Sequence, residues 1–121
     1  MKKKLVFIGD TNSINIEIVV KSHQYLKNKL KYVVIGNYKE ILNFTKKNKF
    51  EIKVNEILDP FDFSDYFRNS LNVFNIQDVS KYKYKNLLNQ IYISNVIANK
   101  TKFDLVTLAI DKSIFKKKLN L

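Results

Sequence analysis

The sequence predicts an α/β protein of three layers, α/β/α, in which helices cover both faces of a largely parallel β-sheet. Short apolar runs rich in branched residues alternate along the chain with longer segments whose apolar residues recur every three or four positions. Near-continuous apolar runs are typical of parallel strands that are buried on both faces. The length of 121 residues and the 45% hydrophobic content fit a single domain, and no linker-like segment divides residues 1–121.

The first half of the chain predicts two strand–helix pairs. Apolar runs at residues 4–8 and 32–35 each end at a glycine, as strands that enter a loop often do. Helical spacing of apolar residues predicts helices over residues 13–28 and 38–48. The stripe that indicates the first helix consists of Ile14, Ile18, Val19, Ser22, Tyr25, Leu26 and Leu30.

The second half continues the alternation. Residues 50–57 alternate apolar and polar side chains, which predicts a half-exposed or edge strand. Asp59 and Pro60 then open an irregular stretch that reaches about residue 70. Beyond it the pattern predicts a strand, a helix, the most apolar strand of the chain and the start of a further helix, over residues 71–76, 84–99, 105–110 and 113–119.

The composition excludes several classes of protein. The chain has no cysteine and one histidine, which excludes a disulfide framework, a thiolate metal site and an all-histidine metal site. The first apolar run is too short for an export signal, and the longest uncharged stretch, residues 86–99, is too short and too polar for a membrane span. We therefore expect a soluble protein of the reducing cytoplasm, without a membrane partner.

The formal net charge of 22 − 11 = +11 raises the question of nucleic-acid binding. All the cations except Arg68 are lysines, although the planar guanidinium is the better ligand for phosphates and base edges. Abundant Lys, Asn and Ile are also what an AT-rich genome produces, so the composition disfavours a nucleic-acid partner. The run Lys81–Lys85 interleaves lysines with Tyr82 and Tyr84 and is the segment that could stack single-stranded bases, although a helix start with Tyr84 on the core explains it more simply.

Two loops are expected where α/β sheets bind their ligands, beyond the carboxyl ends of the strands. The loop from Gly9 to Ser13 enters a helix amino terminus, whose free N–H groups can hold an anion, but an ordinary capped turn is the simpler explanation. The loop from Ala109 to Ser113 contains Asp111 and Lys112, and this lysine could bind a phosphate or a carbonyl oxygen. A solvated helix start is the simpler explanation of that pair.

Two further candidates also have plain explanations. Asp59, Asp62 and Asp65 are spaced three apart, but they lack the glycine and the terminal glutamate of a calcium loop and are typical of turns. His23 lies within the first predicted helix, with no cysteine or second histidine to complete a metal site. A structural or solvent-facing role is therefore favoured for this histidine.

Two stretches, residues 9–17 and residues 104–112, carry a family resemblance. The first keeps Gly9, Asp10, Ile14 and Glu17 of the pattern G-D-P-x-G-I-G-P-E. The second follows D-A-L-V-T-x-P-I-x-K in order, one position shorter, and its matches are Asp104, Val106, Thr107, Ile110 and Lys112. Together these stretches resemble the NAD-dependent 4-hydroxythreonine-4-phosphate dehydrogenases of pyridoxal phosphate synthesis. The chain departs from the two patterns at Thr11, Ser13, Asn15 and Ala109, where the family has proline or glycine.

The resemblance implies the first domain of the isopropylmalate dehydrogenase-like fold. The cleft residues that it implies are Gly9, Asp10, Thr11, Asn12, Ser13, Glu17, Thr107, Asp111 and Lys112. Family members use NAD and a divalent metal, and their metal-binding histidines and G-H-T substrate motif follow the lysine motif. We therefore expect this chain to contribute no catalytic residue, to bind no metal or NAD alone, and to have an incomplete sheet with exposed apolar surface.

Three hypotheses for the function follow. The favoured one is a truncated or degenerate N-terminal fragment of such a dehydrogenase, inactive alone. The second is one half of a split dehydrogenase, in which a C-terminal partner polypeptide supplies the histidines and the remaining sheet; a homodimer mate is a further partner implied by the family. The third is a small basic nucleic-acid-binding module.

Overall fold

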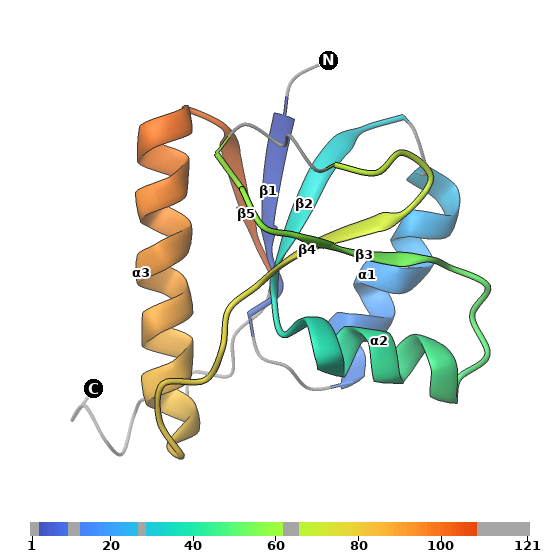
Figure 1. Cartoon of the computed structure of the whole chain (residues 1–121), viewed down its shortest axis with the longest axis horizontal. Helices are drawn as coiled ribbons and strands as arrows, with labels where there is room; N and C mark the ends of the chain where they lie inside the picture. Colours follow the sequence, from blue (N-terminus) through green and yellow to red (C-terminus); the bar gives the residue numbers. More distant parts are fainter. Residues whose placement is uncertain (1–2, 10–12, 27–28, 62–65, 109–121) are drawn as a thin grey trace.

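The computed structural model describes residues 3–9, 13–26, 29–61 and 66–108, which form five strands and three helices. Helices α1 and α2 lie on one face of the sheet and α3 lies on the other (Figure 1). The predicted three-layer architecture is therefore confirmed. The elements in chain order are β1 (Lys3–Phe7), α1 (Ser13–Leu26), β2 (Lys31–Gly36), α2 (Tyr38–Lys47), β3 (Val54–Ile57), β4 (Leu71–Asn75), α3 (Lys83–Thr101) and β5 (Asp104–Thr107).

The five strands form one sheet in the order β3-β4-β2-β1-β5, and every neighbouring pair is parallel. The connections through α1 and α2 run toward one edge of the sheet, whereas the connection through α3 returns to the other edge. Because parallel crossovers are right-handed, this reversal places α3 on the opposite face. The direction of the chain thus reverses between β1 and β5, the kind of position at which open α/β sheets bind ligands.

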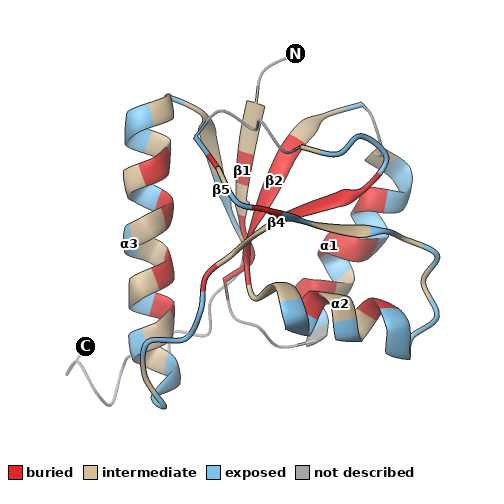
Figure 2. Ribbon diagram, in the orientation of Figure 1, coloured by how far each residue is buried: buried red, intermediate tan, exposed pale blue. Residues whose placement is uncertain are grey.

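The central strand β2 is buried on both faces, as its apolar run predicts. Tyr32 and Val34 pack in the cluster that includes α1 and α2, whereas Val33 and Ile35 pack in the cluster that includes α3. This alternation follows from the two-residue period of a strand. Figure 2 shows the resulting band of buried residues along β1, β2 and β4.

Helix α1 forms as predicted but turns a different face toward the sheet. Its buried side chains are Asn15, Ile16, Val19, Val20 and His23. Ile14 and Tyr25, which belong to the predicted stripe, are instead 63% and 80% exposed. The two buried polar residues have internal hydrogen-bond partners, so a count of apolar residues could identify the helix but not its rotation.

The two edge strands also differ from the prediction. Strand β3 is an edge strand as expected, but its ladder covers Val54–Ile57 only. Strand β5, expected to be the most apolar strand, forms the opposite edge with Val106 44% exposed. Within the described residues, no strand pairs with its outer side. Residues 109–110 of this predicted strand and the predicted helix over 113–119 lie outside the described residues.

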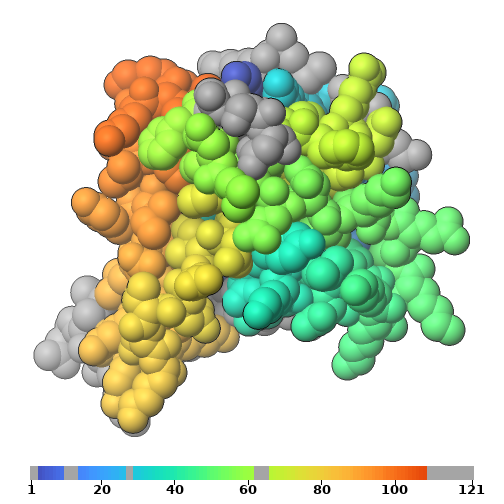
Figure 3. Space-filling model, viewed as in Figure 1, coloured from blue at the N-terminus to red at the C-terminus, as the bar shows by residue number. Residues whose placement is uncertain are grey.

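The segments on either side of β4 shape the surface. Residues 58–61 and 66–70 lie beside the amino ends of the strands in the space-filling view (Figure 3). At the other end, Asn37 caps α2, because its side-chain oxygen accepts a hydrogen bond from the Glu40 N–H at 3.0 Å. None of the helices in the described part of the chain is long and apolar enough to span a membrane.

Candidate functional site

The fold brings the two sequence motifs to neighbouring strand ends. Strands β1 and β5 pair with Phe7 opposite Thr107, and the Leu108 N–H donates to the Phe7 carbonyl oxygen at 3.0 Å. Gly9 and Thr107 therefore leave the sheet side by side, at the carboxyl edge and at the reversal point between the two faces. Stretches almost one hundred residues apart in sequence thus approach each other where an α/β sheet has room for a ligand.

The exit from β1 is fixed by Gly9 and Asn15. Gly9 is buried with a φ angle of 73°, a left-handed conformation that favours glycine. The Asn15 side chain is 4% exposed, and its Nδ2 donates to the Ile8 carbonyl oxygen at 3.0 Å. Asn15 stands where the family pattern has a glycine. Its amide contacts the end of β1, a place that a glycine, which has no side chain, would leave unoccupied. This structural role of Asn15 was not predicted.

Glu17 does not face an anion-binding helix start. It lies beyond the first turn of α1, and its Oε1 is 2.7 Å from the Lys21 Nζ one turn later. The hydrogen bond and the negative charge of Glu17 raise the pKa of Lys21 above its ordinary value. Glu17 is thus engaged along the helix surface, and a place in the cleft remains a prediction for it.

Of the remaining predicted cleft residues, the structure describes Thr107 and the backbone of Ser13. Thr107 is exposed at the end of β5, and Ser13 begins α1. The predicted side-chain roles of Ser13 fall outside the described residues, and so do Asp10, Thr11, Asn12, Asp111 and Lys112. The geometry therefore places the ends of β1 and β5 side by side, whereas the cleft role of each residue stays a prediction.

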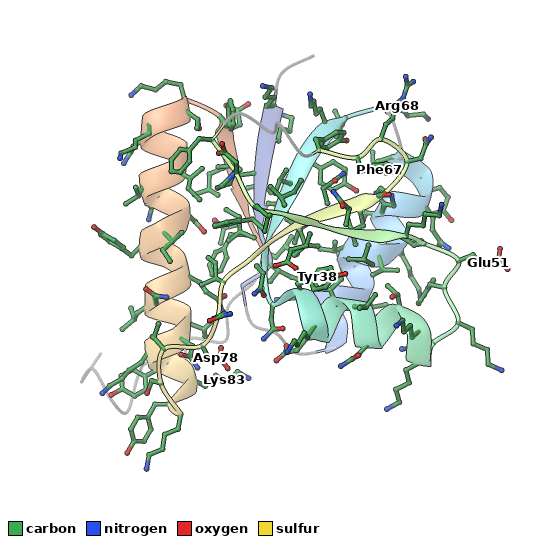
Figure 4. All side chains as sticks on the ribbon, viewed as in Figure 1. Tyr38, Glu51, Phe67, Arg68, Asp78 and Lys83 are labelled. Atoms are coloured by element: carbon green, nitrogen blue, oxygen red, sulfur yellow. The ribbon has the colours of Figure 1, made fainter. Side chains whose placement is uncertain are left out.

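A second polar region lies along the same edge, at the ends of β2 and β4. The Tyr38 N–H donates to Asn75 Oδ1 at 2.9 Å, which ties the start of α2 to the end of β4. A cavity of about 340 Å³ opens beside Asn37. Figure 4 shows the side chains of Asp78, on the segment before α3, and Lys83, the first residue of α3, close together. Both residues line this cavity, which has a carboxylate and an ammonium group in its wall.

The segment before α3 is held by one asparagine. Asn86 Oδ1 accepts the backbone N–H groups of Val79 and Ser80 at 2.9 and 3.0 Å, and its Nδ2 donates to the Ser80 carbonyl oxygen at 2.9 Å. In the same wall, Gln90 is 3% exposed and its Oε1 has no hydrogen-bond partner within the described part of the chain. This region was not predicted from the sequence, in which the asparagines at its turns are its one signal.

The histidine has a structural setting. His23 is 5% exposed, and its Nδ1 lies 2.6 Å from the Tyr32 hydroxyl oxygen, so a strand and a helix share one buried hydrogen bond. Burial raises the pKa of Tyr32 well above its ordinary value, so the hydroxyl is protonated at neutral pH. Among the described residues, no group of three His, Cys, Asp or Glu side chains could hold a metal ion.

The other two candidates, the aspartates from Asp59 and the run Lys81–Lys85, have structural explanations. Asp59 Oδ1 accepts the Phe61 N–H at 2.9 Å, which is a turn contact; Asp62 and Asp65 lie outside the described residues. In the run Lys81–Lys85, the Nζ atoms of both end lysines lie 5.3 Å from the centre of the Tyr82 ring. These lysines lie close to the ring on which a base would have to stack.

Solved structures share this fold. The chain matches a 4-hydroxythreonine-4-phosphate dehydrogenase from Burkholderia phymatum with a TM-score of 0.78 and 18% sequence identity, over 98% of this chain and 39% of that one. A 4-hydroxythreonine-4-phosphate dehydrogenase from Klebsiella pneumoniae matches over 97% of this chain and 39% of its own, also with a TM-score of 0.78 and 18% identity. The chain thus spans about two fifths of the length of the proteins it matches.

The match confirms the family resemblance at the level of the fold. This chain has the architecture of the N-terminal part of 4-hydroxythreonine-4-phosphate dehydrogenases, although sequence identity is low. No protein-family model matches the sequence, and no curated protein matches it significantly.

Proposed function

We propose that this chain forms the N-terminal part of a catalytic unit like that of 4-hydroxythreonine-4-phosphate dehydrogenases, and that it is inactive without the remaining part. The observation that supports the proposal is the match of nearly the whole chain to 39% of such an enzyme. The proposal includes a role in pyridoxal phosphate synthesis, the use of NAD and a location in the cytoplasm.

In this unit the carboxyl edge of β1 and β5 forms one wall of the cleft. The loops after Gly9 and after Thr107 face the substrate and the cofactor, and Lys112 acts electrostatically on a phosphate or a developing negative charge. In the assembled unit, NAD would supply the hydride acceptor and a divalent metal would polarise the substrate. We assign the residues that would hold both groups to the rest of the unit.

We assign the packing of the rest of the unit to the open side of the sheet. Beside β5 lies an apolar cavity of about 210 Å³, lined mainly by carbon atoms of α1, β1 and β5. Ile18 from α1 and Val106 from β5 line it and are 47% and 44% exposed. Contiguous apolar surface next to an open strand edge is typical of a surface that another segment covers. This surface supports the split-enzyme form of the proposal, in which a partner polypeptide binds here.

The first experiment measures the chain alone. Purified protein is incubated with NAD, 4-hydroxythreonine 4-phosphate and a divalent metal, and NADH formation is followed by absorbance. We expect no formation above the protein-free background. Turnover by the chain alone would refute the proposal, provided that Lys112→Ala removes it and so excludes a contaminating enzyme.

The second experiment separates a split enzyme from an inactive remnant. The chain is co-expressed with a polypeptide from the same organism that carries a G-H-T motif and metal-spaced histidines, and NADH formation is measured again. A split enzyme regains activity and the two chains co-elute, whereas Val106→Glu, which places a carboxylate on the open side, lowers both co-elution and activity. A remnant shows neither co-elution nor activity, and the fragment hypothesis then stands.

A further inference from the structure

The amino edge of the sheet, opposite the candidate cleft, gathers cations and aromatic rings. The Nζ of Lys31 lies 5.0 Å from the centre of the Tyr66 ring, and the Nζ of Lys3 lies 5.4 Å from that of Phe103. The amino ends of β1, β2 and β5 and the segment over residues 66–70 thus contribute to one surface. We define this amino-edge surface by Lys3, Lys4, Lys29, Lys31, Tyr66, Phe67, Arg68, Lys100, Lys102 and Phe103.

A buried asparagine builds one part of this surface. Asn72 is 1% exposed, and its Nδ2 donates to the carbonyl oxygens of Phe67 and Ser70, both at 3.0 Å. Its Oδ1 accepts the Phe67 N–H at 2.9 Å and the Asn55 Nδ2 at 2.8 Å. Both donors and the acceptor of the amide are therefore used, and they hold the turn over residues 67–70 in one conformation.

The turn presents a ring and a guanidinium to solvent. Phe67 is 58% exposed, and Arg68, the only arginine of the chain, is exposed beside it. Figure 4 shows both side chains at the same rim of the molecule, away from the cavity beside Asp78. Unlike Tyr82, Phe67 has no cation or ring against it among the described residues. A face of this ring is therefore available for stacking.

Among the described residues, cations prevail on the amino-edge surface. Three described carboxylates belong to the segments that flank it, those of Asp104, Asp59 and Glu51. Asp104 is paired with Lys4 at 3.2 Å, and Asp59 accepts the Phe61 N–H. Glu51 lines a separate hollow behind Asn69, together with His23. The excess of positive charge suits a polyanion, and the exposed ring suits a polyanion that carries flat aromatic groups.

We propose that the amino-edge surface binds single-stranded nucleic acid. A base stacks on Phe67, while Arg68 and the lysines at the start of β2 contact backbone phosphates. This site lies on the opposite edge from the proposed dehydrogenase cleft and differs from the Lys81–Lys85 segment singled out in the sequence. The surface could not be found from the sequence, because its residues come from four separate parts of the chain.

The test measures binding of fluorescein-labelled 12-nucleotide oligo(U) RNA and oligo(dT) DNA by fluorescence anisotropy with the full chain, at several salt concentrations. Affinity falls as salt rises, with a log–log slope of about −0.7 for each phosphate neutralised. Phe67→Ala lowers the affinity about tenfold at unchanged slope, since it removes one stacked base, and Phe67→Tyr retains it. Arg68→Ala makes the slope shallower by about 0.7.

Lys46→Ala is the matched control for Arg68→Ala, because it removes one exposed charge from the far end of α2. The proposal requires that this control changes affinity clearly less than Arg68→Ala does. Equal losses in both variants, with no effect of Phe67→Ala, would mean that net charge alone drives binding and would overturn it. The proposal would also be overturned if Tyr82→Ala lost affinity and Phe67→Ala did not, or if the protein bound neither oligonucleotide at low salt. Competition by polyglutamate or anionic vesicles as strong as that by nucleic acid would overturn it as well. Circular dichroism checks that each variant is folded.

Discussion

The two halves of the sheet differ in how completely the chain covers them. In the β2–β4 half, Val33, Val34, Ile35, Leu71 and Val73 are all 0% exposed. In the β1–β5 half, α3 covers one face, but Val106 is 44% exposed beside an apolar cavity on the other. The comparison teaches that this chain holds one finished core and one surface suited to a further segment. Each of the following predictions tests that contrast.

The largest effect is expected from Ile35→Ala in the finished half. Ile35 is fully buried between β2 and α3, so the substitution removes buried methyl groups and leaves a cavity. We expect the free energy of unfolding to fall by about 2–5 kcal/mol. Urea denaturation followed by circular dichroism measures it. Ile18→Ala, on the open side, is the control, and an equal loss there would remove the contrast between the halves.

The next effect concerns the tight end of β2. A Cβ added at Gly36 would lie 2.6 Å from Ile8 Cγ2, closer than packing allows. We expect Gly36→Ala to lower the free energy of unfolding by about 1–3 kcal/mol, because Ile8 must move within the core. In the double variant with Ile8→Ala, which removes Cγ2, we expect the two losses to be less than additive, because the new Cβ then no longer meets that methyl group. If Gly36→Ala alone is neutral, the end of β2 is less tightly packed than described.

Tyr32 lies at the boundary of the two halves and makes stability depend on pH. Burial raises the pKa of its hydroxyl in the folded state, whereas the unfolded chain loses that proton near pH 10. The stabilisation is therefore fully present below pH 10 and decreases as the pH rises above it. Tyr32→Phe costs about 1 kcal/mol at pH 7, since the hydrogen bond to His23 is lost, and flattens this alkaline decrease. Unfolding curves between pH 7 and 11 measure both effects, with Tyr25→Phe as an exposed control.

The smallest effect is expected in the open half. Val106→Ala removes methyl groups that are already partly exposed, so we expect a loss of about 0.5 kcal/mol or less in the chain alone. The same substitution at the fully buried Val34 costs several times more. When the remainder of the catalytic unit is bound, Val106→Ala weakens that binding measurably. A large effect in the isolated chain would mean that this side is already covered.

The sequence predicted the fold well because parallel, doubly covered strands leave a strong pattern. The run Val33 to Ile35 is apolar at every position, and the structure buries each of these residues on one face or the other. The rotation of α1 was not predictable in the same way. Asn15 and His23 are inside because of their partners Ile8 and Tyr32, and the hydropathy of a residue does not report its partners.

The candidate site was predictable in place but not in detail. Gly9 and Thr107 do meet at the carboxyl edge, because parallel strands bring their ends together. The asparagines that fix the surrounding turns, such as Asn72 and Asn86, gave no signal. Their amides act on backbone groups within a few residues, and such contacts depend on turn geometry that a single sequence does not specify.

The placement of β5 next to β1 has a consequence for how the chain folds during synthesis. Strand β1 is made first, but its outer neighbour begins only at Asp104, about 70 residues after β2 ends. At translation rates of about 5–20 residues per second, the outer edge of β1 waits roughly 3–14 s for its partner. During that interval a nascent chain exposes an unpaired apolar strand, the state in which chains mispair and aggregate. Depletion of chaperones should therefore lower the yield of folded protein. We expect this loss at degrees of depletion that leave the packing of the β2–β4 core unchanged.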